Sequence, residues 1–191
     1  VDTDGLVDGD ALTAITLTPS GSDVTTEGKI TPSEATTTNG IANYNVTYAA
    51  GTLTITAVAA TVTTAPTALE LTYSGSAQAL VNAGEPNNGT MYYQMTTNNE
   101  QPTSTDGFTG DIPTAINAGT YYVWYYAKAT DTNHSDSEIS TTGIEVTIAK
   151  KALTITAKAQ TISYGSDITT GVDQVDTDGL VDGDALTAIT L

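Results

Sequence analysis

The chain contains one histidine, His134, and it lies among side chains that could form a hydrolytic site. Asp131 and Asp136 flank it, and several serines are close in sequence. A catalytic triad depends on geometry in space rather than on proximity in sequence. A lone histidine in a polar, turn-like stretch is typical of solvent-facing surface. The chain also has no cysteine, phosphate-binding loop or nucleophile elbow, so the sequence predicts a protein that is not an enzyme.

Aspartates recur in two places at a spacing that could bind a hard cation. Carboxylates two residues apart beside a glycine turn are typical of calcium loops. The pattern of an EF-hand is not met, and aspartate also favours ordinary turns because it bonds to nearby backbone. We therefore expect no cofactor, with a structural calcium ion as the alternative. Its ligands would be Asp2, Asp4, Asp8 and Asp10, or Asp176, Asp178, Asp182 and Asp184.

An aromatic run, GTYYVWYYA at 119–127, offers a third kind of chemistry, the stacking of rings on sugars. In a strand, alternation places Tyr122, Trp124 and Tyr126 on one face. Exposed, these three would form a glycan-binding platform. Aromatic side chains also fill the cores of small β domains. We expect the second role, with Trp124 largely buried, one face in the core and the other packed under a loop or a neighbouring module.

Composition narrows the class of protein further. The chain has 22 acidic residues against five lysines and a net charge of −17. Nucleic acids and anionic membranes are bound by basic patches, so the sequence predicts neither as a partner. No stretch approaches the roughly 20 apolar residues of a membrane span. The absence of cysteine excludes disulfides and is typical of surface proteins of Gram-positive-type bacteria.

The elements that must position these residues are β-strands. Apolar and polar residues alternate with period two, the pattern of half-buried strands, and no long helical pattern is present. LTAITL at 12–17 is ambiguous between a strand and a turn followed by a strand. The clearest alternating runs are 44–48, 52–57, 69–73, 121–126, 144–148 and 153–157. The sequence predicts an all-β fold of immunoglobulin-like sandwich modules, with a β-grasp-like arrangement as the alternative for the first and last segments.

The chain begins and ends with the same seventeen residues, VDTDGLVDGDALTAITL, at 1–17 and 175–191. Such identity indicates a tandem repeat with a period of 174 residues, from 175 − 1. We expect the chain to be cut from a longer array of two alternating modules. Residues 1–57 are the C-terminal part of module A, and residues 58–151 are a complete module B. Residues 152–191 are the N-terminal part of the next module A.

Three motifs of module A carry a resemblance to a known family. A tyrosine–glycine pair follows the first strand (Tyr164, Gly165), a G-L-x-x-G-D turn comes next (179–184 and 5–10), and the module closes with NYNVTYAAGTLTIT at 43–56. Together they resemble the MBG/YDG-type repeat domains of bacterial surface proteins and adhesins. Module B is similar to a second repeat module found beside them. The resemblance implies tandem β modules and a structural or adhesive role.

These observations predict a secreted, non-enzymatic stalk or adhesin segment on the bacterial cell surface, in a cell wall of the Gram-positive type. Two alternatives remain: a module that binds mucin or other host or environmental glycans, and a subunit of a self-assembling filament. The expected partners are neighbouring copies of the repeat. Residues 152–174 of one copy would complete, strand to strand, the module begun by residues 1–57 of another. Such a head-to-tail contact does not close and propagates.

Overall fold

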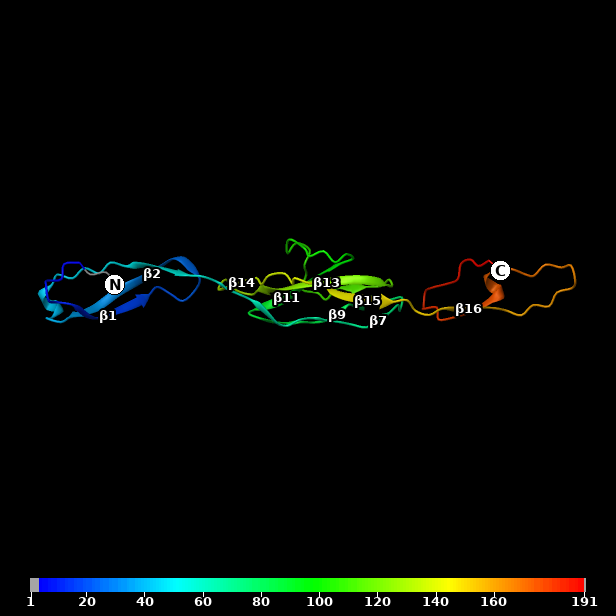
Figure 1. Ribbon diagram of the computed structural model, residues 1–191, viewed down its shortest axis with the longest axis horizontal. Helices are drawn as coiled ribbons and strands as arrows, with labels where there is room; N and C mark the ends of the chain where they lie inside the picture. Colours follow the sequence, from blue (N-terminus) through cyan, green and yellow to red (C-terminus); the bar gives the residue numbers. More distant parts are fainter. Residues whose placement is uncertain (1–3, 191) are drawn as a thin grey trace. The chain divides into compact units, whose positions relative to one another are not determined.

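The computed structural model describes residues 4–190 as an all-β chain (Figure 1). The chain divides into two compact units. Unit 1 comprises Val1–Ala59 and Ala129–Ser135, and unit 2 comprises Ala60–Lys128 and Asp136–Leu191. Within the described range the only helical segments are the 3-10 turns η1 (Ile41–Asn43) and η2 (Val172–Gln174).

Unit 1 is built on a three-stranded sheet in the order β1-β2-β3. Both pairings are antiparallel, between β1 (Leu12–Pro19), β2 (Thr25–Thr37) and β3 (Gly51–Ile55). A parallel pair of β4 (Val58–Ala59) and β14 (His134–Ser135) adds the loop that follows β13 to this unit. The ambiguous run 12–17 is thus a strand, and the predicted strand at 52–57 is confirmed over Gly51–Ile55.

Unit 2 contains a four-stranded sheet in the order β11-β13-β15-β7, in which β13 pairs antiparallel with β15 and β15 pairs parallel with β7. Short strand pairs face this sheet, and β16 pairs with β17 beyond it. The strands are β5 (Thr61–Thr64), β6 (Thr67–Ala68), β7 (Leu71–Thr72), β8 (Gln78–Ala79), β9 (Val81–Asn82), β10 (Glu85–Asn87), β11 (Gly89–Thr96), β12 (Thr114–Ala115), β13 (Gly119–Ala129), β15 (Ile144–Ala149), β16 (Thr154–Ala157) and β17 (Val175–Asp178).

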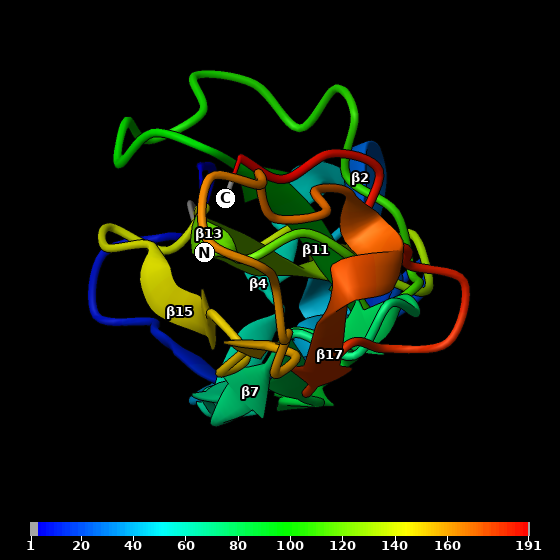
Figure 2. The ribbon, with the colours of Figure 1, turned by 90° about the vertical axis from the view of Figure 1, so that its right-hand side faces the viewer.

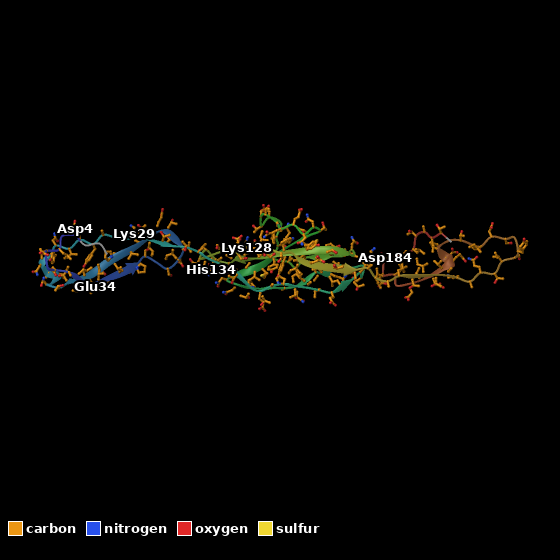
Figure 3. The ribbon with its side chains drawn as sticks, viewed as in Figure 1. Asp4, Lys29, Glu34, Lys128, His134 and Asp184 are labelled. Carbon is orange, nitrogen blue, oxygen red and sulfur yellow. The ribbon has the colours of Figure 1, made fainter. Side chains whose placement is uncertain are left out.

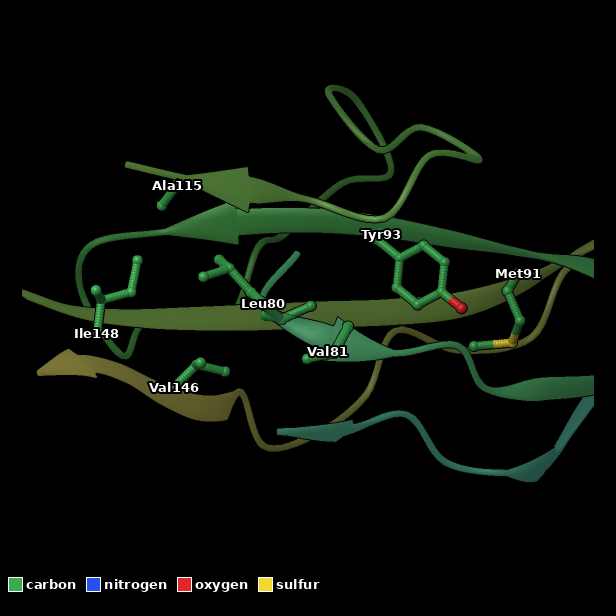
Figure 4. Packing of buried hydrophobic residues seen from close by; sticks show 8 residues of the cluster. Leu80, Val81, Met91, Tyr93, Ala115, Val146 and Ile148 are labelled. Atoms are coloured by element: carbon green, nitrogen blue, oxygen red, sulfur yellow. The ribbon is translucent and has the colours of Figure 1, made fainter. Parts of the chain in front are cut away.

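Two buried clusters form the core of unit 2, one on each face of β13. The first gathers Leu80, Val81, Met91, Tyr93, Ala115, Val123, Val146 and Ile148 (Figure 4). The second contains Phe108, Trp124 and Tyr126 beneath the loop 97–113, which arches away from the sheet (Figure 2). Among the described residues, the buried hydrophobic side chains outside these clusters are Ala35, Ala60, Ala127, Val175 and Val181. The well-packed core therefore belongs to residues 80–148.

One predicted strand is absent, and another is shorter than predicted. The run 44–48 alternates like a strand, but no part of it is hydrogen-bonded as one. A strand forms only where a neighbour supplies the ladder, and within unit 1 the three-stranded sheet does not extend to this segment. The run 69–73 is reduced to β7 (Leu71–Thr72), because Leu69 bonds to Leu80 on the opposite side instead of to β15.

Candidate functional site

An apolar groove with a volume of about 780 Å³ lies in unit 1. One wall is the face of β1 and β2, and the other is formed by the segments 4–6 and 41–51. We call it the unit 1 groove. Its apolar lining consists of Leu6, Leu12, Ile15, Leu17, Ile30, Pro32, Ala35, Ile41, Val46 and Ala49. A groove of this composition is suited to apolar side chains and has no cluster of charges for a polar substrate.

Two groups in the groove wall indicate what kind of occupant would fit. Val46 is 39% and Tyr48 42% exposed, although their alternation is that of half-buried strand residues. Thr37 is only 8% exposed, and no group in the described range makes a hydrogen bond of good geometry to its hydroxyl, although it lies close enough to Asp10 to help lower the pKa of that carboxyl. A strand would cover the apolar atoms and bring backbone donors and acceptors to such orphaned groups.

Asp10 holds one end of this groove together. Its Oδ1 accepts hydrogen bonds from the backbone N–H groups of Ala11 and Asn39, both at 3.0 Å. Its Oδ2 accepts the hydroxyl of Tyr44 at 2.7 Å. The bond from Tyr44 holds the pKa of Asp10 below its ordinary value and raises that of Tyr44. The conspicuous tyrosine of the NYNVTY motif is thus tied to the aspartate of the G-L-x-x-G-D turn.

Residues 152–190 form the opposite case, a segment built on the β16–β17 hairpin in which Val175 and Val181 are buried but most other large apolar side chains are exposed. The four residues of β16 are all exposed, although β16 pairs with β17 over four positions. Ile155 is 41%, Ile162 50% and Ile168 49% exposed. Tyr164 is fully exposed at a turn that Gly165 allows with φ of 83°. The predicted strand at 153–157 is thus present as β16 without a buried face, whereas the stretch TISYG at 161–165, also expected as a first strand of module A, forms no strand.

The duplicated segment has two different surroundings in the same chain. In the C-terminal copy its first residues form β17 against β16, whereas residues 186–190 form no strand. In the N-terminal copy residues 12–17 belong to β1 against β2. The turn between them is the same in both copies, with an N–H to C=O bond of 3.0 Å from Asp10 to Val7 and from Asp184 to Val181. The turn is thus local, and each strand depends on its partner.

The aromatic strand is a core strand, which confirms the expectation for Trp124. Trp124 and Tyr126 are each 2% exposed, and Tyr122 is half-buried. The indole N–H donates to the Thr96 hydroxyl at 3.0 Å, and Tyr126 packs edge-on against Phe108. Buried rings cannot stack on a sugar, so their burial gives the predicted glycan platform no support. Glycan binding stays a prediction.

His134 belongs to a loop that connects modules rather than to a cluster of reactive groups. Its Nδ1 lies 2.7 Å from Asp131 three residues earlier, and this bond lowers the pKa of Asp131. The neighbouring Asn133 donates to the Asp23 carboxylate at 2.9 Å and accepts from the Val24 N–H at 2.8 Å. This role of Asn133 could not be predicted from the sequence, because an asparagine in a polar loop carries no signal for a contact more than 100 residues away. The prediction of no enzymatic activity stays a prediction.

The candidate calcium ligands are dispersed or engaged elsewhere. Asp2 lies outside the described residues. Asp4 lines the unit 1 groove, Asp176 pairs with Lys158 at 3.6 Å, and Asp184 accepts a hydrogen bond from Tyr73 (Figure 3). Asp8 and Asp182 occupy the two equivalent turns, and Asp178 ends β17. Over residues 4–190, no group of three or more acidic or histidine side chains is placed to hold a metal ion.

Comparison with known proteins leaves the family open. No protein-family model matches the chain, and neither a curated protein nor a solved structure matches it. The resemblance to MBG/YDG-type repeats therefore depends on the short motifs alone and stays a prediction. No helix in the described range is long and apolar enough to cross a membrane.

Proposed function

We propose that this chain is a structural repeat segment of a bacterial cell-surface protein, a stalk or adhesin shaft built from alternating modules. One observation carries the proposal: residues 1–17 and 175–191 are identical, and the N-terminal copy pairs with β2 whereas the C-terminal copy pairs with β16. The described residues include no group of three or more acidic or histidine side chains placed to hold a metal ion, and the unit 1 groove is lined mainly by apolar side chains. The location outside the cell is inferred from composition and from the resemblance of the motifs.

We further propose that the unit 1 groove takes the first strands of module A from the preceding repeat. The groove exposes an apolar lining, while Leu153 and Ile155 expose apolar side chains that alternate along one face. Burying an isoleucine or leucine stabilises by about 1.5–3 kcal/mol. In a continuous array the donor lies in the same polypeptide. Between separate chains the same contact would build a head-to-tail filament.

The duplicated segment also supplies the expected register of this contact. In β16–β17, Thr154 lies opposite Asp178 and Thr156 opposite Asp176. Asp178 corresponds to Asp4, since the offset is 174. The donor strand should therefore place Thr154 opposite Asp4, at the edge of the groove that Asp4 and Leu6 line.

Sedimentation velocity of the purified chain tests this proposal. We expect multimers whose size grows with concentration. Ile155→Ser should weaken the association by about tenfold or more, the factor expected from exposing one apolar side chain. Thr156→Ser, on the other face of the strand, is the matched control and should change little. A chain that stays monomeric at every concentration, or equal weakening in both variants, would overturn completion between chains.

The cellular location needs a separate experiment. Antibodies raised against this chain should label intact source cells, and external protease should remove the label. Labelling that appears only after the cells are permeabilised would exclude a surface role, whatever the outcome for the groove.

A further inference from the structure

The chain contains a second contact between modules, made by the duplicated turn. In the C-terminal copy, the Tyr73 hydroxyl donates to Asp184 Oδ2 at 3.1 Å. Val181 lies against Gly75 so closely that a Cβ on the glycine would sit 2.9 Å from the Val181 Cγ2 atom. Gly75 also has φ of 77°, which favours glycine. Position 75 therefore favours glycine for two reasons: its φ is positive, and Val181 leaves little room for a side chain.

The turn at 73–76 is firmly attached to module B. The Tyr73 N–H donates to the carbonyl of Ala149, the last residue of β15, at 2.9 Å. Tyr73 also packs against the first core cluster, and the Ser76 N–H contacts the Ser74 hydroxyl. The turn is thus placed where the chain leaves module B and enters the next module A.

The valine of the duplicated turn is buried in the copy that makes this contact and exposed in the copy that does not. Val181 is 9% exposed, whereas Val7, its counterpart, is 62% exposed. Both turns have the same internal hydrogen bond, so the difference does not arise from local structure. Val181 is buried because the Tyr73–Gly75 turn packs against it.

The aspartate at the end of the turn can serve both modules at once. A carboxylate has about four acceptor positions. Asp10 uses three of them for Ala11, Asn39 and Tyr44, with both backbone donors on Oδ1 and the tyrosine on Oδ2. Oδ2 is also the atom to which Tyr73 donates in the other copy.

We propose that the Tyr73–Gly75 turn is the docking site for the Val-Asp-Gly-Asp turn of the following repeat, and that Val7 and Asp10 are the surface that receives this site from a second copy. In a continuous array one aspartate accepts Tyr44 from its own module and Tyr73 from the module before it. This contact fixes module B to the next module A. It is separate from the filling of the groove, since it uses neither β16 nor the groove lining.

Disulfide trapping tests the contact, and the absence of native cysteine removes any background. The expected Cβ position at residue 75 lies 3.5 Å from the Val181 Cβ atom. The Gly75→Cys/Val181→Cys chain should oxidise at least about tenfold faster than a Gly75→Cys/Val172→Cys control, because a disulfide needs Cβ atoms about 3.5–4.5 Å apart. Val181→Cys removes the Cγ2 atom that would crowd a Cβ at position 75. A rate no faster than that of the control, in a chain whose unfolding curve matches that of the native chain, would overturn the contact.

Docking of the Tyr73–Gly75 turn of one chain onto Val7 and Asp10 of another is tested with a mixture of two chains. One carries Gly75→Cys with Val181→Ser, which loosens its own turn, and the other carries Val7→Cys. We expect a mixed disulfide dimer, and adding Tyr73→Phe to the first chain should lower its yield about threefold to tenfold, the factor for one hydrogen bond. Val24→Cys, at another exposed valine, is the control. Trapping of the intrachain pair without the mixed dimer would confine the contact to this chain and overturn the repeat-to-repeat role.

These outcomes are independent of the sedimentation test. If Ile155→Ser abolishes multimers but no Gly75 pair is trapped, the groove proposal stands and the turn proposal fails. If the cysteine pairs form but the chain without introduced cysteines stays monomeric at every concentration, the turn proposal stands and the groove proposal fails.

Discussion

Trp124 is held from several directions, and each contact is specific. Its N–H donates to Thr96, its ring shares a cluster with Phe108 and Tyr126, and Gly143 leaves room for it. A Cβ at position 143 would lie 3.0 Å from two atoms of the indole ring. The residue is therefore part of the second core face, and its importance should appear in stability.

We predict that Trp124→Ala lowers the free energy of unfolding by about 3–5 kcal/mol, because it deletes a fully buried ring and leaves a cavity. Chemical denaturation followed by circular dichroism measures this loss. Thr120→Ala, at an exposed position of the same strand, is the control and should cost little. An unchanged unfolding curve for Trp124→Ala, together with loss of binding to a mucin glycan, would instead favour the glycan-binding alternative.

Asp10 should make unit 1 sensitive to acid. Its pKa is lowered, chiefly by the hydrogen bond from Tyr44, so the folded state favours the ionised carboxylate. The stabilisation is then complete above the unfolded pKa and is lost as the pH falls through the lower, folded value, below about pH 4. NMR of the Asn39 and Ala11 amides should show this titration, and Asp10→Asn should remove it. A titration midpoint above that of an ordinary aspartate would contradict the assignment.

At the scale of strands, alternation predicts a strand correctly where the chain itself supplies a partner for the ladder, as it does for β3 and β16 and in module B. Alternation correctly placed a strand at 144–148 and a long central strand at 121–126, because both meet partners within the same sheet. It failed at 44–48, where the side-chain pattern is right but no neighbour completes the ladder. The Tyr73–Asp184 and Asn133–Asp23 contacts were not predictable, since they join polar loop residues across more than 100 positions.

The two copies of the duplicated segment allow the dependence of a strand on its ladder partner to be measured. Residues 12–17 belong to β1, whereas residues 186–190 of the identical copy form no strand. We predict that the amides of 12–17 exchange with solvent more slowly than those of 186–190, because strand amides are protected by the ladder. The amides of Val175–Asp178 in β17 should also be protected. NMR resolves the two copies, and equal exchange in both would mean that the segment folds without regard to its neighbours.

At the scale of the whole molecule, the well-packed core and the apolar residues without cover lie in different places. Both large buried clusters belong to residues 80–148, while exposed apolar side chains concentrate before residue 60 and after residue 150. Exposed apolar side chains beside unpaired strand edges favour association. This distribution agrees with the proposal that neighbouring repeats cover the segments before residue 60 and after residue 150.

The final prediction concerns a chain with two repeats, in which residues 1–174 are followed by 1–191. In this chain the internal copy of the duplicated segment follows β16 of the first repeat and precedes β2 of the second repeat. One complete module A can therefore form within one polypeptide. We expect the strand signal in circular dichroism, at concentrations where chains do not associate, to exceed twice that of the single repeat. The run equivalent to 44–48 should gain protected amides, because its missing ladder partner is now present.

The control is the same two-repeat chain with Ile155→Ser in the first repeat only. That change removes one apolar side chain from the donor strand and leaves both copies of module B intact. It should reduce the additional strand signal and lower the melting temperature of the internal module, since a smaller buried area weakens its packing. If the two-repeat chain gives only twice the signal of one repeat, and the variant behaves identically, the halves of module A do not complete each other. The exposed strands would then have to be covered by a partner other than the repeat itself.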